Sequence, residues 1–449
     1  LSTLEQSVGD AAWTFTNGRP TIATADGRFS LSLRTRFQFD AASFMQKDNL
    51  PATVTNRDLS SGAVVRRAYF GIEGRFFKDF WYEFRLNFGG STGENVVNGD
   101  PNLNLARIAY LGIPNFRINV GIIQPIFTYG NTVSSGQLTF IERSPAVNIA
   151  TSNFGGEDNR RGIEMTFQKQ GFLLPTDNFL LTGAFTGANS GDTAGHGNNG
   201  DEQSQILGRA AYRLWSDGIS NIQIGGSFAQ ITHISPTHGT TQLRDRPEMR
   251  VDGTRLIDTG ALNTRPGTSM WSVDAEMNWN RLYLGGEYHE YNILRNPAAG
   301  VVGADLADAK FTAWYAESSF VLVGPPKAYS PSAMNNEIGS WGAPRVIKPF
   351  SLSGGSWGTW EVAVRYSDTD LNHNEKAGLA GGPLATAFDP AVRGGEQKIW
   401  TLGLNWYLNN NVRLTVNDMI VKVNRLTPGA GAPPAQAQAG QNLNIVGAR

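Results

Sequence analysis

Hydrophobic and polar residues alternate with a period of two along most of the chain. Within residues 28–39, apolar side chains hold most of the alternate positions, and arginines, serines and a glutamine stand between them. The same alternation recurs at 80–88, 271–279 and 360–367. Successive side chains of a β-strand point to opposite faces, so each segment is predicted to be a strand with one apolar and one polar face.

About sixteen such strands are predicted, joined by connections that alternate between short and long. They begin near residues 28, 64, 80, 102, 115, 160, 178, 204, 219, 269, 281, 309, 357, 397, 411 and 441. One connection on the short side, 324–356, is unusually long. Tight turns alternating with long loops are typical of a membrane β-barrel, and an even strand number closes the sheet. We predict an all-β fold, a transmembrane antiparallel β-barrel over 28–449, after an N-terminal segment at 1–27.

The apolar faces of the predicted strands suit a lipid environment. They carry phenylalanine, tryptophan and leucine where a soluble protein would carry charges. Aromatic residues at strand ends, such as Trp81, Tyr110 and Trp215, fit the interfacial girdles of such barrels. The first residues lack the pattern of a signal peptide, so the chain is either mature or cytosolic. For an outer-membrane barrel we expect a mature chain whose signal peptide has been removed. A soluble β-sandwich or β-helix is the alternative, but it does not explain the alternating loops.

Composition excludes several functions. The 449 residues carry a net charge of −1, which disfavours a nucleic-acid partner. There is no cysteine, and the five histidines show no metal-binding spacing. We therefore predict no catalytic residues, no metal centre and no cofactor. Asp368, Asp370 and Asn372 begin like a calcium loop but lack its glycine and closing glutamate, which leaves a loose calcium site open.

Arginine dominates the basic residues, and arginine binds oxyanions in a fixed, bidentate geometry. If the apolar face meets lipid, the polar face lines the lumen, where arginines outnumber carboxylates. The predicted anion pathway is Arg34, Arg36, Arg67, Arg75, Arg85, Arg117, Arg209 and Arg213. Fixed positive charge in a pore favours anions. The alternative is that these charges pair across the lumen and brace the wall.

The connection at about 124–159 is rich in aromatic side chains that water would solvate poorly. We predict that this third loop folds into the barrel and narrows it; a packed surface or subunit-contact loop is the alternative. The residues expected at the constriction are Gln124, Tyr129, Glu142 and Arg143.

Five segments resemble the phosphate-selective porin O and P family of Gram-negative outer membranes. They are VVRRAYFGIEGRFFKDFWYEFRLNF (64–88), YLGIPNFRINVGIIQPI (110–126), LTFIERS (138–144), RPEMRVDGTRLIDTG (246–260) and GTWEVAVRYSDTDLN (358–372). The resemblance implies a trimer of sixteen-stranded barrels, an inward third loop and an arginine ladder that includes Arg34, Arg67, Arg209 and Arg213.

The chain departs from that family's pattern in two places. Members often carry a lysine near the start of the third loop, where this chain has Gln124. Such barrels usually finish on an aromatic residue, whereas this chain stops at Arg449, so we expect a few further residues beyond it.

The function that follows is a passive outer-membrane porin favouring small anions, phosphate or related oxyanions. Its expected partners are small anionic solutes, outer-membrane lipid and lipopolysaccharide, and two further copies in a homotrimer. A general, sugar or carboxylate pore with weak ion selectivity stays open, because Tyr69, Trp81, Tyr283 and Tyr315 are predicted to face the lumen. A structural barrel without conductance is the third possibility.

Overall fold

The structure is a computed structural model that describes most of the chain. The described residues are 11–16, 18–46, 58–90, 102–157, 159–189, 202–234, 239–296, 307–331, 337–377, 390–426 and 440–449. Several of the predicted long connections lie largely outside these ranges.

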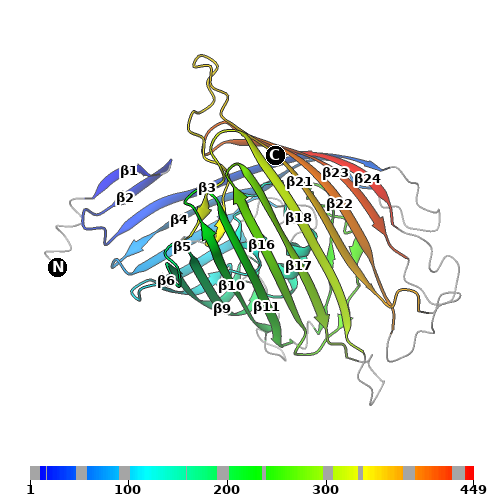
Figure 1. Ribbon diagram of the computed structural model, residues 1–449. Coiled ribbons are helices and arrows are strands. Elements are labelled where there is room, and N and C mark those ends of the chain that lie inside the picture. The colour runs from blue at the N-terminus through cyan, green and yellow to red at the C-terminus, as the bar shows by residue number, and fades with distance from the viewer. Residues whose placement is uncertain are drawn as a thin grey trace.

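Sixteen tilted antiparallel strands form a closed barrel (Figure 1). They are β3 (Ser30–Gln46), β4 (Gly62–Phe76), β5 (Phe80–Asn87), β6 (Asn102–Tyr110), β7 (Phe116–Ile123), β8 (Arg160–Gln170), β9 (Asn178–Asn189), β10 (Ser204–Ser216), β11 (Asn221–His233), β16 (Ser269–Trp279), β17 (Leu282–Ile293), β18 (Ala309–Val323), β21 (Thr359–His373), β22 (Val392–Tyr407), β23 (Arg413–Asn424) and β24 (Asn442–Ala448). The last strand pairs with the first, from Leu443 opposite Gln46 to Ala448 opposite Ala41. Closure gives every barrel strand a hydrogen-bonded neighbour on both sides, the arrangement that a bilayer favours. The predicted fold class is confirmed.

The segment before the barrel forms a hairpin that sequence periodicity did not predict. Strands β1 (Ala12–Thr16) and β2 (Arg19–Ala23) pair with each other, and β2 pairs with the start of β3. The hairpin lies beside the barrel near the N-terminus (Figure 1). Arg19 holds it to the wall through Glu73, at 2.6 Å.

The two faces of the wall differ as the alternation predicts. Phe37, Phe70 and Val120 point outward and are 69, 52 and 51% exposed, while their polar neighbours point into the lumen. Tryptophans stack near the strand ends that the short turns join, including Trp360 on Trp406 with ring centroids 5.0 Å apart. The described helices are too short and too polar to cross a membrane.

The apolar core of the molecule lies inside the barrel. It is built by the constriction loop (residues 124–159), which contains α2 (Tyr129–Thr132) and α3 (Pro145–Asn153), and by the second inward loop (residues 239–268). Phe127, Phe140 and Phe154 of the constriction loop are 0–1% exposed. The predicted inward fold of the third loop is thus confirmed, and burial of its rings explains it.

The second inward loop was not predicted to enter the lumen. Its short strands are β12 (Thr240–Thr241), β13 (Arg244–Asp245), β14 (Ile257–Asp258) and β15 (Leu262–Asn263). Its residues Leu243, Met249 and Ile257 are fully buried against α3 and the wall. The aliphatic residues of this loop are scattered among polar ones without a regular period. The sequence pattern therefore did not predict that the loop enters the lumen.

The long connection on the short-turn side also enters the barrel. Its described parts, residues 324–331 and 337–358, contain β19 (Tyr329–Ser330) and β20 (Ser340–Trp341). Trp341 packs against Tyr129 of the constriction loop, and Lys327 donates to Thr139 of that loop at 2.5 Å. The lumen is therefore narrowed from both ends of the barrel.

Candidate functional site

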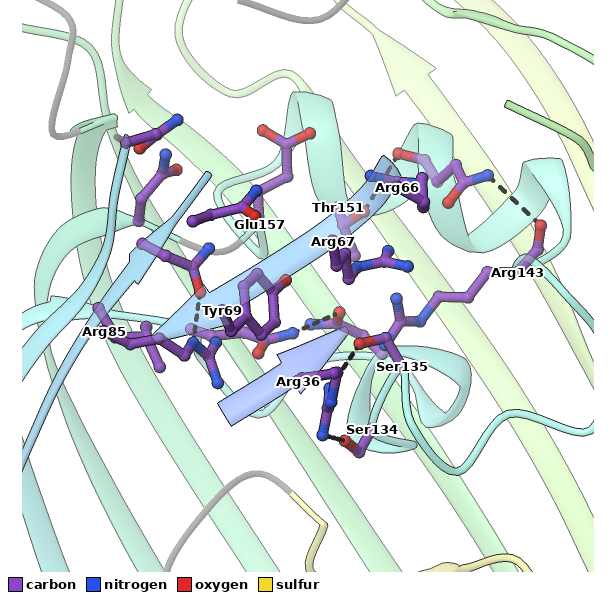
Figure 2. Close-up of a pocket in the computed structure, with 18 of the residues that line it drawn as sticks. Arg36, Arg66, Arg67, Tyr69, Arg85, Ser134, Ser135, Arg143, Thr151 and Glu157 are labelled. Carbon is purple, nitrogen blue, oxygen red and sulfur yellow. Dashed lines mark hydrogen bonds between the residues drawn. The ribbon is translucent and has the colours of Figure 1, made fainter. Parts of the chain in front are cut away.

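A polar cavity of about 410 Å³ lies between the β3–β6 wall and the constriction loop (Figure 2). The second inward loop closes its third side. Its charged lining residues are Arg34, Arg36, Arg66, Arg67, Arg85, Arg107, Arg143, Arg244, Arg250, Arg255, Glu83, Glu142, Glu157 and Glu337. Among the described residues that line it, ten arginines thus face four glutamates. Asparagine, serine and threonine supply most of the remaining surface.

Arginines lie at regular intervals along the cavity wall because inward-facing positions of a strand are two residues apart. Arg34 and Arg36 are two positions apart on β3, and the next inward residue, Gln38, pairs with Arg67 of β4. Inward residues two positions apart are separated by about 7 Å along a strand. Arg34, Arg36 and Arg67 therefore stand at three successive levels of the cavity wall.

Arg36 lies at the middle of these three levels, and its hydrogen-bond partners among the described residues are neutral. Its two terminal nitrogens donate to the hydroxyls of Ser135 at 2.6 Å and Ser134 at 2.9 Å, as Figure 2 shows. Its guanidinium also lies over the ring of Tyr69, 5.8 Å from the centroid. Among the described residues, the partners of Arg36 are thus hydroxyls and a ring, and its guanidinium lines the cavity.

A β-bulge brings two consecutive arginines into the same lumen. The register of β3 and β4 shifts between Gln38 and Phe39, so Arg66 becomes an extra residue opposite the partner strand. Both Arg66 and Arg67 are buried and point to the cavity side of the wall (Figure 2). A bulge re-aims a side chain in this way. Strict alternation would have placed Arg66 in lipid.

Two of the glutamates are each surrounded by several guanidinium groups. Glu83 lies 2.8 to 3.4 Å from nitrogens of Arg107, Arg34 and Arg85. Glu142 lies within 4 Å of four arginines: Arg66, Arg67, Arg250 and Arg449. Burial alone would raise the pKa of the Glu142 carboxyl, but the surrounding guanidinium groups hold that pKa well below its usual value.

Other wall carboxylates point at the constriction loop instead of at the cavity. Glu164 of β8 accepts the backbone N–H of Ile126 at 2.6 Å. Glu287 of β17 accepts the N–H of Tyr129 and that of Gly130, the latter at 3.1 Å. Both glutamates are buried and accept hydrogen bonds from the loop backbone, and neither lines the cavity. They therefore do not offset the arginine excess of the cavity lining.

The second inward loop is also held to the wall by hydrogen bonds to a buried carboxylate. Its Glu248 accepts from Arg365 of β21, from Ser367 at 2.8 Å and from Thr401 of β22 at 2.7 Å. A carboxylate on a loop thereby meets three donors on the wall, which satisfies its buried charge. This arrangement presents Arg244, Arg250 and Arg255 to the cavity.

Replacing Glu287 by alanine is expected to loosen the constriction. Two backbone N–H groups lose a charged acceptor, and each such hydrogen bond is worth about 1.5–3 kcal/mol. We expect larger and noisier single-channel conductance in planar bilayers. The control Glu290→Ala removes an outward-facing carboxylate from the same strand and is expected to conduct as the unmodified chain does. Equal conductance of all three chains would contradict this account of the loop.

The structure brings together four of the eight arginines that the sequence assigned to the anion pathway. Arg34, Arg36, Arg67 and Arg85 line the cavity; Arg75, Arg117, Arg209 and Arg213 do not. Of the four residues assigned to the constriction, Gln124, Glu142 and Arg143 line the cavity as well. Tyr129 points the other way, into the wall, where its hydroxyl lies 2.8 Å from that of Tyr283.

Each of the four remaining arginines has its own neighbours. Arg75 donates to the carbonyl of Lys78 in a short turn, and Arg117 contacts Glu164. Arg209 is fully buried on the opposite wall, paired with Asp274. Arg213 lies over the ring of Tyr329, 4.7 Å from its centroid. Alternation correctly predicts that a side chain faces inward but does not predict what already occupies the space beside it.

Sequence reasoning missed five arginines of the cavity. Arg66 is placed by the bulge, and Arg244, Arg250 and Arg255 come from a loop without periodicity. Arg107 lies in the apolar run of β6, where alternation is weak. The string Arg-Pro-Glu-Met-Arg at 246–250 was a usable signal, since it is among the segments that carry the family resemblance.

The possible calcium loop is not a loop. Asp368, Asp370 and Asn372 all lie in β21, with both aspartates on its outward side. Asp368 contacts Lys398 at 3.8 Å. Within the described ranges, no three histidine or carboxylate side chains are grouped so that they could hold a metal ion.

A closed barrel with an apolar outer face, a polar lumen and inward loops that narrow it defines a class of protein, the outer-membrane porins. The chain belongs to the phosphate-selective porin O and P family, whose pattern it matches over residues 33–432. It is therefore a porin channel of a Gram-negative outer membrane.

Individual relatives are more distant. Porin O of Pseudomonas aeruginosa is 21% identical over 431 residues, which cover 93% of this chain and 88% of that protein. An uncharacterized protein of Caulobacter vibrioides is 24% identical over 418 residues, covering 92% and 72%. Among solved structures, an anion-selective porin from Comamonas acidovorans superposes with a TM-score of 0.48 at 14% identity, covering 94% of this chain and 98% of that one.

Proposed function

We propose that this porin passes small anions by preference, phosphate and related oxyanions among them. The observation that carries the proposal is the cavity lining of ten arginines against four glutamates, at the place where the inward loops narrow the lumen. A channel lined by one sign of charge concentrates counter-ions and repels ions of its own sign.

Transport along this path requires no covalent chemistry. An oxyanion entering the cavity exchanges part of its hydration shell for guanidinium N–H donors, which bind oxyanions in a bidentate manner. Arg67, Arg36 and Arg34 offer such donors at successive levels, so the ion moves between several moderate sites. Several weak sites permit release, whereas one very tight site would stop the flow.

The chemistry of the constriction favours a broad range of oxyanions over phosphate alone. Gln124 occupies the place of a family lysine, and its amide donates to Asn131 at 3.2 Å. A neutral amide adds no charge to the cavity, and no lysine lines it within the described part of the chain. Selectivity therefore depends on arginine alone.

The sugar-pore alternative has less support from the geometry. Of the four aromatic residues that were predicted to face the lumen, Tyr69 alone lines the cavity. The guanidinium of Arg85 lies over the ring of Tyr69, 4.5 Å from the ring centroid. That of Arg107 lies over the ring of Trp81, 4.9 Å from its centroid. Tyr283 and Tyr315 are buried beneath the constriction loop. An aromatic slide for sugars needs accessible ring faces, and these faces are covered.

The test is the reversal potential of the purified protein in a planar bilayer under a potassium chloride gradient. We expect an anion-selective current that inorganic phosphate reduces in a dose-dependent manner. A cation-selective or unselective current would overturn the proposal. Absence of any current would favour the structural-barrel alternative.

The proposal extends to the surroundings of the channel. We propose a homotrimer in outer-membrane lipid and lipopolysaccharide, which is supported by membership of the family and by the apolar outer face.

A further inference from the structure

Glu142 of the constriction loop occupies the centre of an arginine cluster at the cavity wall. Its Oε1 lies 2.9 Å from Nε of Arg66, 3.4 Å from Nη1 of Arg67 and 2.6 Å from Nη2 of Arg449. Its Oε2 lies 3.6 Å from Nε of Arg250. The carboxylate is thus held by guanidinium groups from β4, from the second inward loop and from residue 449.

The backbone beside this carboxylate has contacts of its own with the wall and with residue 449. The backbone N–H of Ile141 donates to Asn417 at 2.8 Å, and the carbonyl of Ile141 accepts from Arg449 at 2.5 Å. The carbonyl of Glu142 accepts from Arg365 at 2.9 Å. Three backbone contacts with the lumen wall and residue 449 therefore hold residues 141 and 142 without using the Glu142 side chain.

Arginines outnumber carboxylates in the described ion pairs of this cluster. Asp40 forms a bidentate ion pair with Arg449, at 2.6 and 2.8 Å. The described pairs of Glu142 and Asp40 thus join two carboxylates to four arginines. Arg66, Arg67 and Arg250 all line the cavity through which a solute passes, and so does Glu142.

A carboxylate oxygen and a phosphate oxygen bind a guanidinium group in the same way: each accepts N–H hydrogen bonds in the plane of the guanidinium. An anion that enters the cavity therefore meets arginine donors already occupied by an anion of the protein itself. Its binding must be weaker than it would be at the same donors left empty.

We propose that Glu142 is a tethered internal anion that competes with the permeating oxyanion for Arg66, Arg67 and Arg250, and so tunes the pore for release. This inference rests on the proposed anion function and names the residue that sets the affinity of the site. A solute that displaces the carboxylate binds; the return of the carboxylate, which cannot diffuse away, promotes its exit.

The test uses Glu142→Gln in the full chain, with inorganic phosphate as the probe that blocks chloride current in planar bilayers. Removing one negative charge about 4 Å from the site, in water-like surroundings, tightens anion binding by about fivefold, and more where water is excluded. We expect phosphate to block the variant at a concentration at least about fivefold lower than it blocks the unmodified chain. Glu290→Gln, an outward carboxylate away from the cavity, is expected to leave the block unchanged.

A second variant separates tuning from a structural role. Arg250→Gln removes a cation from the same cluster and is expected to weaken the block, and the double variant is expected to lie near the unmodified chain. If both single variants instead raise conductance and weaken the block, Glu142 only braces the loop and the inference is wrong. It is also wrong if Glu142→Gln leaves the block unchanged. An unmodified chain without anion preference would overturn the proposed function itself.

Discussion

Reversing the charge of Arg36 is expected to remove most of the anion preference that we propose for the pore. Arg36→Glu changes the charge at the cavity wall by two, at a position whose described partners are serine hydroxyls and a tyrosine ring. Each unit charge about 4 Å from an ion is worth about 1 kcal/mol in water-like surroundings. The two units together are therefore worth about 2 kcal/mol, or about thirtyfold in relative permeability.

The measurement is the chloride-to-potassium permeability ratio, obtained from the reversal potential. The neutral variant Arg36→Gln loses one unit and is expected to lower the ratio by about fivefold. The control is Arg28→Glu, in the exposed turn just before β3, where the side chain is 41% exposed and does not line the cavity. A ratio that responds equally to Arg28→Glu and Arg36→Glu would mean that overall charge, not the cavity, sets selectivity.

Breaking the buried pair between Arg209 and Asp274 is expected to give the largest loss of stability. Both side chains are fully buried, and the two guanidinium nitrogens lie 2.5 and 2.7 Å from the two carboxylate oxygens. Asp274→Ala leaves a guanidinium group under the ring of Tyr129 without its bidentate partner. Removing one partner of such a pair costs about 3–5 kcal/mol.

The readout is the free energy of unfolding in urea for barrels refolded into lipid vesicles, followed by tryptophan fluorescence. The paired change Arg209→Met with Asp274→Leu removes both charges and fills the space with apolar groups, so it is expected to recover most of the loss. If the single and the double variant lose the same free energy, packing at this position matters and the ion pair does not. Anion selectivity is expected to persist in the double variant, since neither residue lines the arginine-rich cavity.

The fold was predictable from sequence because a bilayer imposes a simple rule on every strand. Side chains that face lipid must be apolar and their neighbours face the lumen, so the period of two reveals strands, faces and the short and long connections. Even the anomalous connection at 324–356 was visible as a departure from that rule. The aromatic loop at 124–159 was predictable for a related reason, because its rings had to be buried.

The candidate site was predictable in kind but only partly in composition. The arginine excess on the lumen face pointed to anions, and Arg34, Arg36, Arg67 and Arg85 do meet at one cavity. Arg209 shares the same alternation and the same face, yet it is neutralised by Asp274, 65 positions away in the chain. Nothing in the local pattern of either strand distinguishes the two situations.

The sequence by itself determined the barrel, its approximate strand number, its two faces and the excess of arginine among the predicted inward positions, since these depend on residue types at fixed spacing. The tertiary structure alone decided which arginines line the cavity and which are paired with carboxylates elsewhere in the wall. That outcome depends on distances of 2.5–4 Å between residues far apart in the chain, such as Arg449 and Asp40, and on a bulge that turns Arg66 inward. Charge pairing falls off over ångströms in three dimensions, and the period of a strand does not encode it.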